Sequence, residues 1–160
     1  MVGRWSTMIE NNNTVFSKFI LEAIKLSRGH EYDTGLQAYL TALIVSGGRI
    51  LSVGFNGRDK ASSGLQRRYS QHNSHRASKP CTIHAEIDAV LNCRRKIDLT
   101  GGKVFVIRRL HLDSVENPLI AMAKPCPMCQ AVLFSYGVRR ATYTISNNEF
   151  GVLNLTDPRK

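Results

Sequence analysis

Two short groups of metal-binding side chains lie about forty residues apart in this chain, and they constrain its fold because a shared ion would draw them together. The first group is Cys81-Thr82-Ile83-His84, and the second is Pro125-Cys126-Pro127-Met128-Cys129. Zinc prefers thiolate and imidazole ligands, and ligand pairs three residues apart are common at its sites. The two segments are therefore expected to converge on one zinc ion.

The sequence around each group indicates the start of a helix. Cys126 and Cys129 are three residues apart in a predicted helix, which places their side chains about 60° apart on one face. Pro125 is a favourable residue at a helix start. The unpaired N–H groups and the dipole at a helix N-terminus also stabilise thiolate charge. His84 begins a second predicted helix, so strands leading into the two helices would bring the ligands to one edge of a sheet.

Glu86 distinguishes two kinds of zinc site. If Cys81 is a fourth ligand, the site is closed and structural; if it is not, His84, Cys126 and Cys129 leave one position for water. A carboxylate two residues beyond a ligand reaches that water without binding the metal, takes its proton and returns it to a leaving group. A structural site has no use for such a group, so the sequence favours a catalytic one.

The composition is that of one globular domain of 160 residues. The N-terminal residues lack the basic and apolar regions of a secretory signal, and no apolar run approaches the roughly 18 residues that span a bilayer. We therefore expect a cytoplasmic protein with no membrane partner, in which the four cysteines are metal ligands or buried thiols. Cys93 falls on the opposite side of an ideal helix from His84 and is expected to be a buried thiol.

Hydrophobic periodicity predicts an alternation of helices and strands. A helix over 14–28 precedes a hairpin of two strands, 38–45 and 50–55, joined by a Gly-Gly turn. A basic, Ser-rich loop over 56–80 follows, and the tail from residue 147 is ambiguous. The remaining predicted elements are a helix over 85–95, a strand over 103–108, a helix over 126–136 and a strand over 138–145. This order predicts an α/β sheet with helices on both faces and its last two strands parallel.

The segments His84-Ala85-Glu86 and Pro125-Cys126-Pro127-Met128-Cys129 resemble the zinc-dependent cytidine/deoxycytidylate deaminase superfamily, whose signature is H-x-E…P-C-x-x-C. The resemblance implies a three-layer α/β/α sandwich with a mixed sheet of about five strands, as a single deaminase domain over residues 1–160. It implies one catalytic zinc ion on His84, Cys126 and Cys129, with Cys81 not a ligand. It also implies hydrolytic deamination at C4 of cytosine with Glu86 as proton shuttle, and Ala85 and Pro125 near the base.

A second segment, Gly54-Phe55-Asn56-Gly57, looks like the one that reaches the nucleotide sugar in deoxycytidylate deaminases, so Asn56 is a candidate substrate contact. Arg58-Asp59-Lys60 replaces the Pro and Gly that usually follow, and regulation by triphosphates is not carried over. The basic loop leads into the predicted active-site helix, and arginine offers a bidentate fork for a 5′-phosphate. Candidate contacts there include Arg58, Lys60 and His75. These residues favour dCMP as substrate, giving dUMP and ammonia.

The net charge of +10 leaves other partners open. A deaminase of single-stranded DNA, RNA or tRNA would track a phosphate backbone with basic residues at element ends: Arg94, Arg95, Lys96, Arg108, Arg109, Arg139 and Arg140. Such a groove also needs aromatic side chains for stacking, and the basic loop has only Tyr69. A non-catalytic, zinc-stapled nucleotide-binding module is a further alternative, disfavoured by Glu86. His72 and His75, with Cys81, could bind a second metal. The resemblance also implies a homo-oligomer.

Overall fold

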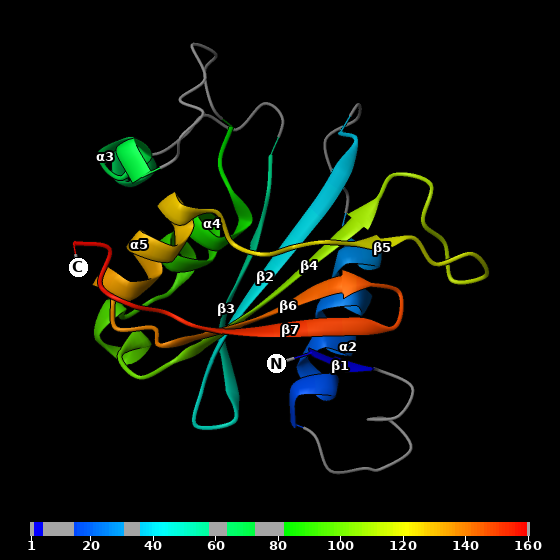
Figure 1. The fold of residues 1–160 in the computed structure, drawn as a ribbon, viewed down its shortest axis with the longest axis horizontal. Coiled ribbons are helices and arrows are strands. Elements are labelled where there is room, and N and C mark those ends of the chain that lie inside the picture. The colour runs from blue at the N-terminus through cyan, green and yellow to red at the C-terminus, as the bar shows by residue number, and fades with distance from the viewer. Residues whose placement is uncertain (1, 5–14, 31–35, 58–63, 73–81, 160) are drawn as a thin grey trace.

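A computed structural model describes residues 2–4, 15–30, 36–57, 64–72 and 82–159, which form one mixed sheet with helices on both faces (Figure 1). The strand order is β1-β7-β6-β4-β2-β3, with β5 added beside β4. β4 and β6 are parallel, as the sequence predicts, and every other pair is antiparallel. The strands are β1 (Val2–Arg4), β2 (Ala38–Ser46), β3 (Arg49–Phe55), β4 (Lys103–Leu110), β5 (Ile120–Ala121), β6 (Arg140–Ser146) and β7 (Glu149–Asn154).

The helices form the two outer layers of the predicted three-layer sandwich. α2 (Val15–Gly29) packs on β2 and β4 from one side, and α4 (Ala85–Asn92) packs on β2 and β3 from the other, next to α5 (Pro127–Ser135) (Figure 1). Three short helical segments complete the described chain: α3 (Gly64–Arg68), η1 (Ser70–His72) and η2 (Lys96–Leu99). The fold class predicted from the sequence is confirmed, with five strands of six or more residues and two shorter ones.

Two hydrophobic clusters hold these layers to the sheet. The periodicity of the predicted helix over 14–28 corresponds to a buried stripe on α2, formed by Phe19, Ile20, Ala23, Ile24 and Ser27. The apolar residues of this stripe pack in one cluster with Phe105 of β4. The opposite cluster joins the sheet to α4 and α5. Among the described residues, no helix is both long and apolar enough to cross a membrane.

The β2–β3 turn has the predicted geometry, whereas the C-terminus of α4 differs from the prediction. Gly47 and Gly48 connect β2 to β3 with positive φ angles of 58° and 75°, as the Gly-Gly turn predicts. The predicted helix 85–95 ends earlier, at Asn92, and Leu91 is 41% exposed rather than packed. Lys96 Nζ donates a hydrogen bond to the Leu91 carbonyl oxygen (3.1 Å), which satisfies a carbonyl at the end of the helix and favours termination there.

Three segments contain structure that the sequence patterns did not predict. The basic loop over 56–80 includes α3 and η1, which pack against α5. The irregular stretch before residue 124 is a hairpin, in which β5 pairs with the end of β4. The ambiguous tail forms β7, antiparallel to β6. Among the described strands, β7 lies between β1 and β6 in the sheet.

α4 packs on β3 with backbone against backbone at Gly54. A Cβ atom on Gly54 would lie 2.2 Å from both the Ala85 carbonyl oxygen and the Ala89 nitrogen. Glycine therefore allows the helix to approach the strand to a distance that a side chain would prevent. Because Ala85 is the first residue of α4, this contact fixes the helix N-terminus over the sheet.

Hydrogen bonds from α4 also satisfy the free edge of β3, the last strand of the sheet. The Phe55 N–H donates to Asp88 Oδ2 (2.9 Å), and Asn92 Nδ2 donates to the Val53 carbonyl oxygen (2.9 Å). Edge strands expose unpaired backbone groups that favour association with other chains, and these two side chains bind two of them. The same bonds fix the position of α4 along the strand.

Replacing Gly54 tests this packing. Gly54→Ala is expected to lower the free energy of unfolding by about 3 kcal/mol, because the added methyl group would overlap the backbone of α4. Urea denaturation of the zinc-loaded protein measures the change. Gly29→Ala is the matched control, since a Cβ atom there has no heavy atom within 4 Å. A Gly54→Ala protein as stable as the wild type would contradict backbone contact between α4 and β3.

Candidate active site

His84, Cys126 and Cys129 form a cluster in which each residue offers one metal-ligand atom. These three atoms all lie within 4.8 Å of one another. His84 Nδ1 is 3.4 Å from Cys129 Sγ and 3.7 Å from Cys126 Sγ. The segments predicted to converge therefore do converge, and the three residues are the one such group among those that the structure describes.

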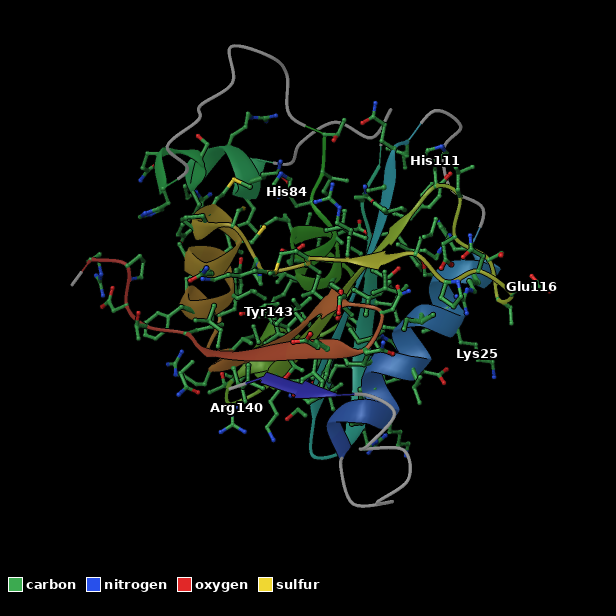
Figure 2. All side chains as sticks on the ribbon, turned by 45° about the vertical axis from the view of Figure 1, so that its right-hand side comes forward. Lys25, His84, His111, Glu116, Arg140 and Tyr143 are labelled. Carbon is green, nitrogen blue, oxygen red and sulfur yellow. The ribbon has the colours of Figure 1, made fainter. Side chains whose placement is uncertain are left out.

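Both segments reach the cluster at the N-terminus of a helix. His84 is the N-cap residue of α4 and Cys126 that of α5, each with extended backbone angles. Figure 2 shows His84 on the side of the molecule that α3 covers, far from Arg140 at the start of β6. The positive end of a helix dipole favours thiolate at Cys126, because the N–H groups of the first turn have no partner within the helix.

Thr144 of β6 positions the link between β5 and α5. Its hydroxyl donates to the Ala121 carbonyl oxygen (2.7 Å), and its own carbonyl oxygen accepts from the Ala123 N–H (2.9 Å). Gln130 of α5 then donates through Nε2 to the Pro125 carbonyl oxygen (2.8 Å). These bonds hold the residues before Cys126, so the first cysteine enters the cluster from a fixed direction.

Gln66 of α3, which no sequence motif marks as a functional residue, fixes the segment before His84. Its side chain is 1% exposed; Oε1 accepts from the His84 N–H (3.0 Å) and Nε2 donates to the Thr82 carbonyl oxygen (2.8 Å). One amide thus binds the backbone on both sides of Ile83. A glutamine in a polar loop carries no periodic signal, so no pattern in the sequence indicates this role.

Glu86 lies in the first turn of α4 and is 3% exposed. Its carboxyl group is close enough to the Cys129 thiol and to His84 for both to affect its pKa. Burial raises the pKa of Glu86 above its ordinary value, although His84 opposes the shift. The carboxyl group is therefore a buried neighbour of the cluster and is not one of its three grouped ligand atoms.

The chemistry of the cluster fits a divalent cation. Burial raises the pKa of Cys129 well above its ordinary value, and nearby Cys126 and Glu86 raise it further. Burial lowers the pKa of His84, but the hydrogen bond with Cys126 and the charges of Glu86 and Cys126 together outweigh it, and the net shift is upward. These shifts reflect buried groups whose negative charges repel. A cation would offset that repulsion, and two sulfurs with one imidazole are ligands that zinc prefers.

Asn56 lies at the same end of the sheet, with its side chain bound to β2. Its Oδ1 accepts from the Leu40 N–H (2.8 Å), and its Nδ2 donates to the Ala38 carbonyl oxygen (3.1 Å). Gly57 then donates its N–H to the Ile83 carbonyl oxygen (3.4 Å), one residue before His84. The amide keeps a second N–H and a second lone pair for a ligand. Its orientation is set by β2.

The other candidate residues divide into buried and undescribed ones. Ala85, the first residue of α4, is fully buried, and Pro125 is buried in the link before α5. Cys93 is 4% exposed and donates through Sγ to the Arg95 carbonyl oxygen (3.4 Å), which confirms a buried thiol. Arg58, Lys60, His75 and Cys81 lie outside the described residues. The second metal site suggested for His72, His75 and Cys81 stays a prediction for the same reason.

Comparisons with known proteins relate this geometry to one family. The family described as the cytidine and deoxycytidylate deaminase zinc-binding region matches residues 14–145. A crystal structure of the dCMP deaminase from the cyanophage S-TIM5 in complex with dCMP and dUMP is similar, with 18% identity, a TM-score of 0.45, and 79% of this chain and 77% of the phage chain covered. The apo form of the same phage enzyme is similar with 19% identity and a TM-score of 0.47, and 82% of each chain is covered. No curated protein sequence matches this chain.

Replacing Gln66 tests its role in fixing the segment before His84. Gln66→Leu is expected to lower the free energy of unfolding by about 3 kcal/mol, because the His84 N–H and the Thr82 carbonyl oxygen lose their buried partner. Denaturation by urea measures the loss. Gln71→Leu, at an exposed glutamine of η1, is the matched control. Equal stability of the Gln66 and Gln71 variants would contradict the structural account of Gln66.

Proposed function

Because this chain belongs to the cytidine and deoxycytidylate deaminase family, we propose that it catalyses zinc-dependent hydrolytic deamination of a cytosine nucleotide, converting dCMP to dUMP and ammonia. The observation that carries the proposal is the position of Glu86. Its carboxyl group is buried beside the cluster of His84 and two cysteines, close enough for all three to affect its pKa. A zinc site that only stabilised the fold would not need a carboxyl group there.

Each residue of the cluster has a part in this proposal. His84, Cys126 and Cys129 hold one zinc ion, which supplies Lewis acidity and lowers the pKa of water. Glu86 takes a proton from the attacking water and returns it to the nitrogen that leaves C4 as ammonia. α4 and α5 exclude bulk water from the carboxyl group, which strengthens its electrostatic interactions.

The substrate contacts proposed from the sequence extend away from the cluster. Asn56 would bind the sugar hydroxyl with the donor and acceptor that β2 leaves available. Ala85 and Pro125 would flank the base, and Arg58, Lys60 and His75 would meet the 5′-phosphate. Hydrogen bonds from a fixed amide favour one sugar position, since the Asn56 side chain need not be ordered on binding.

A glutamine at position 86 tests the proton-transfer role. Glu86→Gln keeps the size and burial of the side chain but cannot accept a proton. We expect ammonia release from dCMP to fall about 1,000-fold in kcat, with the zinc content unchanged. Coupled detection of ammonia and elemental analysis of the purified protein measure the two quantities. Glu116→Gln, at an exposed residue of the β4–β5 hairpin, is the control. Full activity of Glu86→Gln would contradict the role.

Substrates compared in the same assay test the choice of a mononucleotide. The panel is dCMP, CMP, dCTP, deoxycytidine and a cytosine-containing single-stranded oligonucleotide. We expect dCMP to have the highest kcat/KM. Turnover of the oligonucleotide without turnover of dCMP would replace the proposal with a polynucleotide deaminase. If the zinc-loaded protein binds nucleotide but turns over none of these substrates, the result would favour the non-catalytic binding module.

Further properties accompany the proposal. We propose that residues 1–160 act as one deaminase domain, with a single zinc ion in each chain. A cytoplasmic location and a homo-oligomeric state are the expectations carried over from the sequence and the family.

A further inference from the structure

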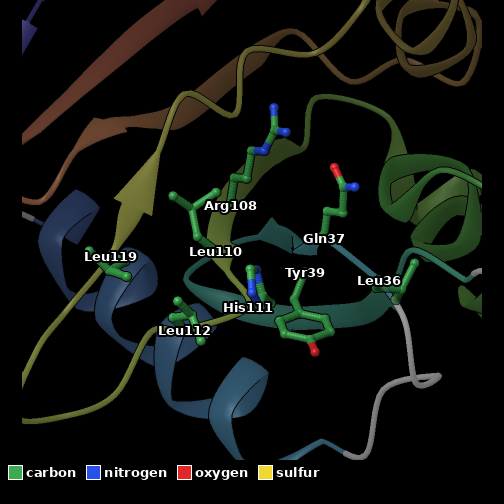
Figure 3. A pocket seen from close by; sticks show the side chains of 8 residues that line it. All are labelled: Leu36, Gln37, Tyr39, Arg108, Leu110, His111, Leu112 and Leu119. Carbon is green, nitrogen blue, oxygen red and sulfur yellow. The ribbon is translucent and has the colours of Figure 1, made fainter.

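A pocket of about 680 Å³ opens where β4 ends and β2 begins, and none of the three candidate metal ligands lines it (Figure 3). The β4–β5 hairpin forms one wall, with leucines and His111. Gln37 and Tyr39 line it from the start of β2, and Arg108 lines it from β4. The described side chains that line this pocket include Arg108 and no carboxylate, so the pocket favours an anionic ligand.

Arg108 belongs to the face of the sheet that carries the candidate active site. Val104 and Val106 of the same strand are fully buried in the cluster that contains Cys129. Alternate residues of a strand share a face, so Arg108 is the next side chain in that row, and it is exposed. Figure 3 shows the Arg108 side chain extending to one side of the sheet and the Tyr39 ring to the other.

The strand register places Arg108 between the two segments that lead to the candidate ligands. On one side it pairs with Leu40 of β2, whose N–H donates to Asn56 Oδ1. On the other side it pairs with Ala121 of β5, in the segment that continues to Cys126. Neighbouring strands are about 4.8 Å apart, so the Arg108 backbone lies about that far from Leu40, the β2 residue that Asn56 binds.

The wall of the pocket is fixed by hydrogen bonds within the β4–β5 hairpin and by hydrogen bonds to two other parts of the fold. Asp113 in the β4–β5 hairpin accepts hydrogen bonds from Arg28 of α2 (2.9 and 3.2 Å) and from the Leu119 N–H (2.6 Å). Asn147, in the turn after β6, accepts from the Ile120 N–H of β5 (2.8 Å). The hairpin is therefore held at both sides, and the pocket does not depend on a ligand to form its wall.

We propose that Arg108 is a further contact of the phosphate group of the nucleotide substrate, besides those proposed in the basic loop, with the pocket next to Arg108 enclosing that end of the molecule. The guanidinium makes no hydrogen bond or ion pair with the residues that the structure describes, whereas Arg28 and Arg109 are both bound. A planar fork of donors matches the oxygens of a phosphate monoester. The nucleotide would then be bound with its base at the cluster, its sugar at Asn56 and its phosphate at Arg108. This inference rests on the proposed nucleotide substrate.

Kinetics with and without the phosphate test the proposal. Arg108→Met is expected to lower kcat/KM for dCMP about 50-fold and to change kcat/KM for deoxycytidine less than about threefold, because only dCMP loses a charge-assisted contact. Arg108→Lys should recover part of the loss, since it restores the charge without the fork. Arg49→Met, at an exposed arginine beside the β2–β3 turn, should leave both substrates unchanged. Equal losses for the two substrates, or no loss for dCMP, would overturn the assignment.

Binding measurements separate this inference from the proposed activity. Calorimetry on zinc-loaded protein compares dCMP with deoxycytidine, before and after the Arg108→Met change in the Glu86→Gln background. If the wild type releases no ammonia but Arg108→Met weakens dCMP binding about 50-fold, the activity fails and the phosphate site stands. If dCMP turns over and Arg108→Met leaves its binding unchanged, the activity stands and the phosphate site fails. Lack of dCMP binding to any of these proteins rejects the phosphate site.

Discussion

The approach of α4 to the backbone of β3 at Gly54 determines where the candidate active site forms. A Cβ atom there would overlap Ala85 and Ala89, so the glycine lets the first turn of α4 rest directly on the sheet. His84 and Glu86 both belong to that end of the helix. Asp88 and Asn92 prevent sliding, since each binds a backbone group of β3. A displaced helix would separate His84 from the two cysteines of α5, whose positions depend on β6 instead.

Electrostatics connects this packing to chemistry. Two cysteines, an imidazole and a carboxyl group are brought together, and the burial of Cys129 and Glu86 raises the pKa values of these two groups. Such a group is costly to bury without a cation. Packing of the sheet and helices therefore offsets the cost of burying this cluster, and a bound zinc ion would reduce that cost. This is the pattern of a functional site that a well-packed fold supports.

The parts of the fold that could be predicted from the sequence were those with local signals. The α2 stripe, the Gly-Gly turn and the two ligand segments each depend on residues close together in the chain. Gly54 also carried a signal, because glycine inside a β run indicates close approach of another backbone. Gln66 did not, since its partners lie sixteen and eighteen residues away and its loop has no periodicity. The two-residue strand β5 is too short for any pattern.

The residues of the candidate metal cluster could be predicted from local signals in the sequence, whereas the residues of the pocket could not. His84, Cys126 and Cys129 were identifiable because ligand chemistry restricts residue types and spacing, and Glu86 because it lies two residues beyond one of them. Arg108 was one arginine among several at element ends. Its relation to the cluster comes from strand register, which places β4 between β2 and β5. Register depends on the whole sheet, and a hairpin insertion between β4 and α5 is invisible to local periodicity.

The central claim is that the zinc ion has two sulfur ligands and one imidazole, with its remaining position open beside Glu86. X-ray absorption spectroscopy at the zinc K-edge, on the purified zinc-loaded protein, tests it most directly. The account predicts two sulfur atoms at about 2.3 Å and two nitrogen or oxygen atoms at about 2.0 Å. The Cys81→Ser protein should give the same spectrum. Three sulfur atoms in the wild type, falling to two in Cys81→Ser, would show a closed structural site and contradict the account.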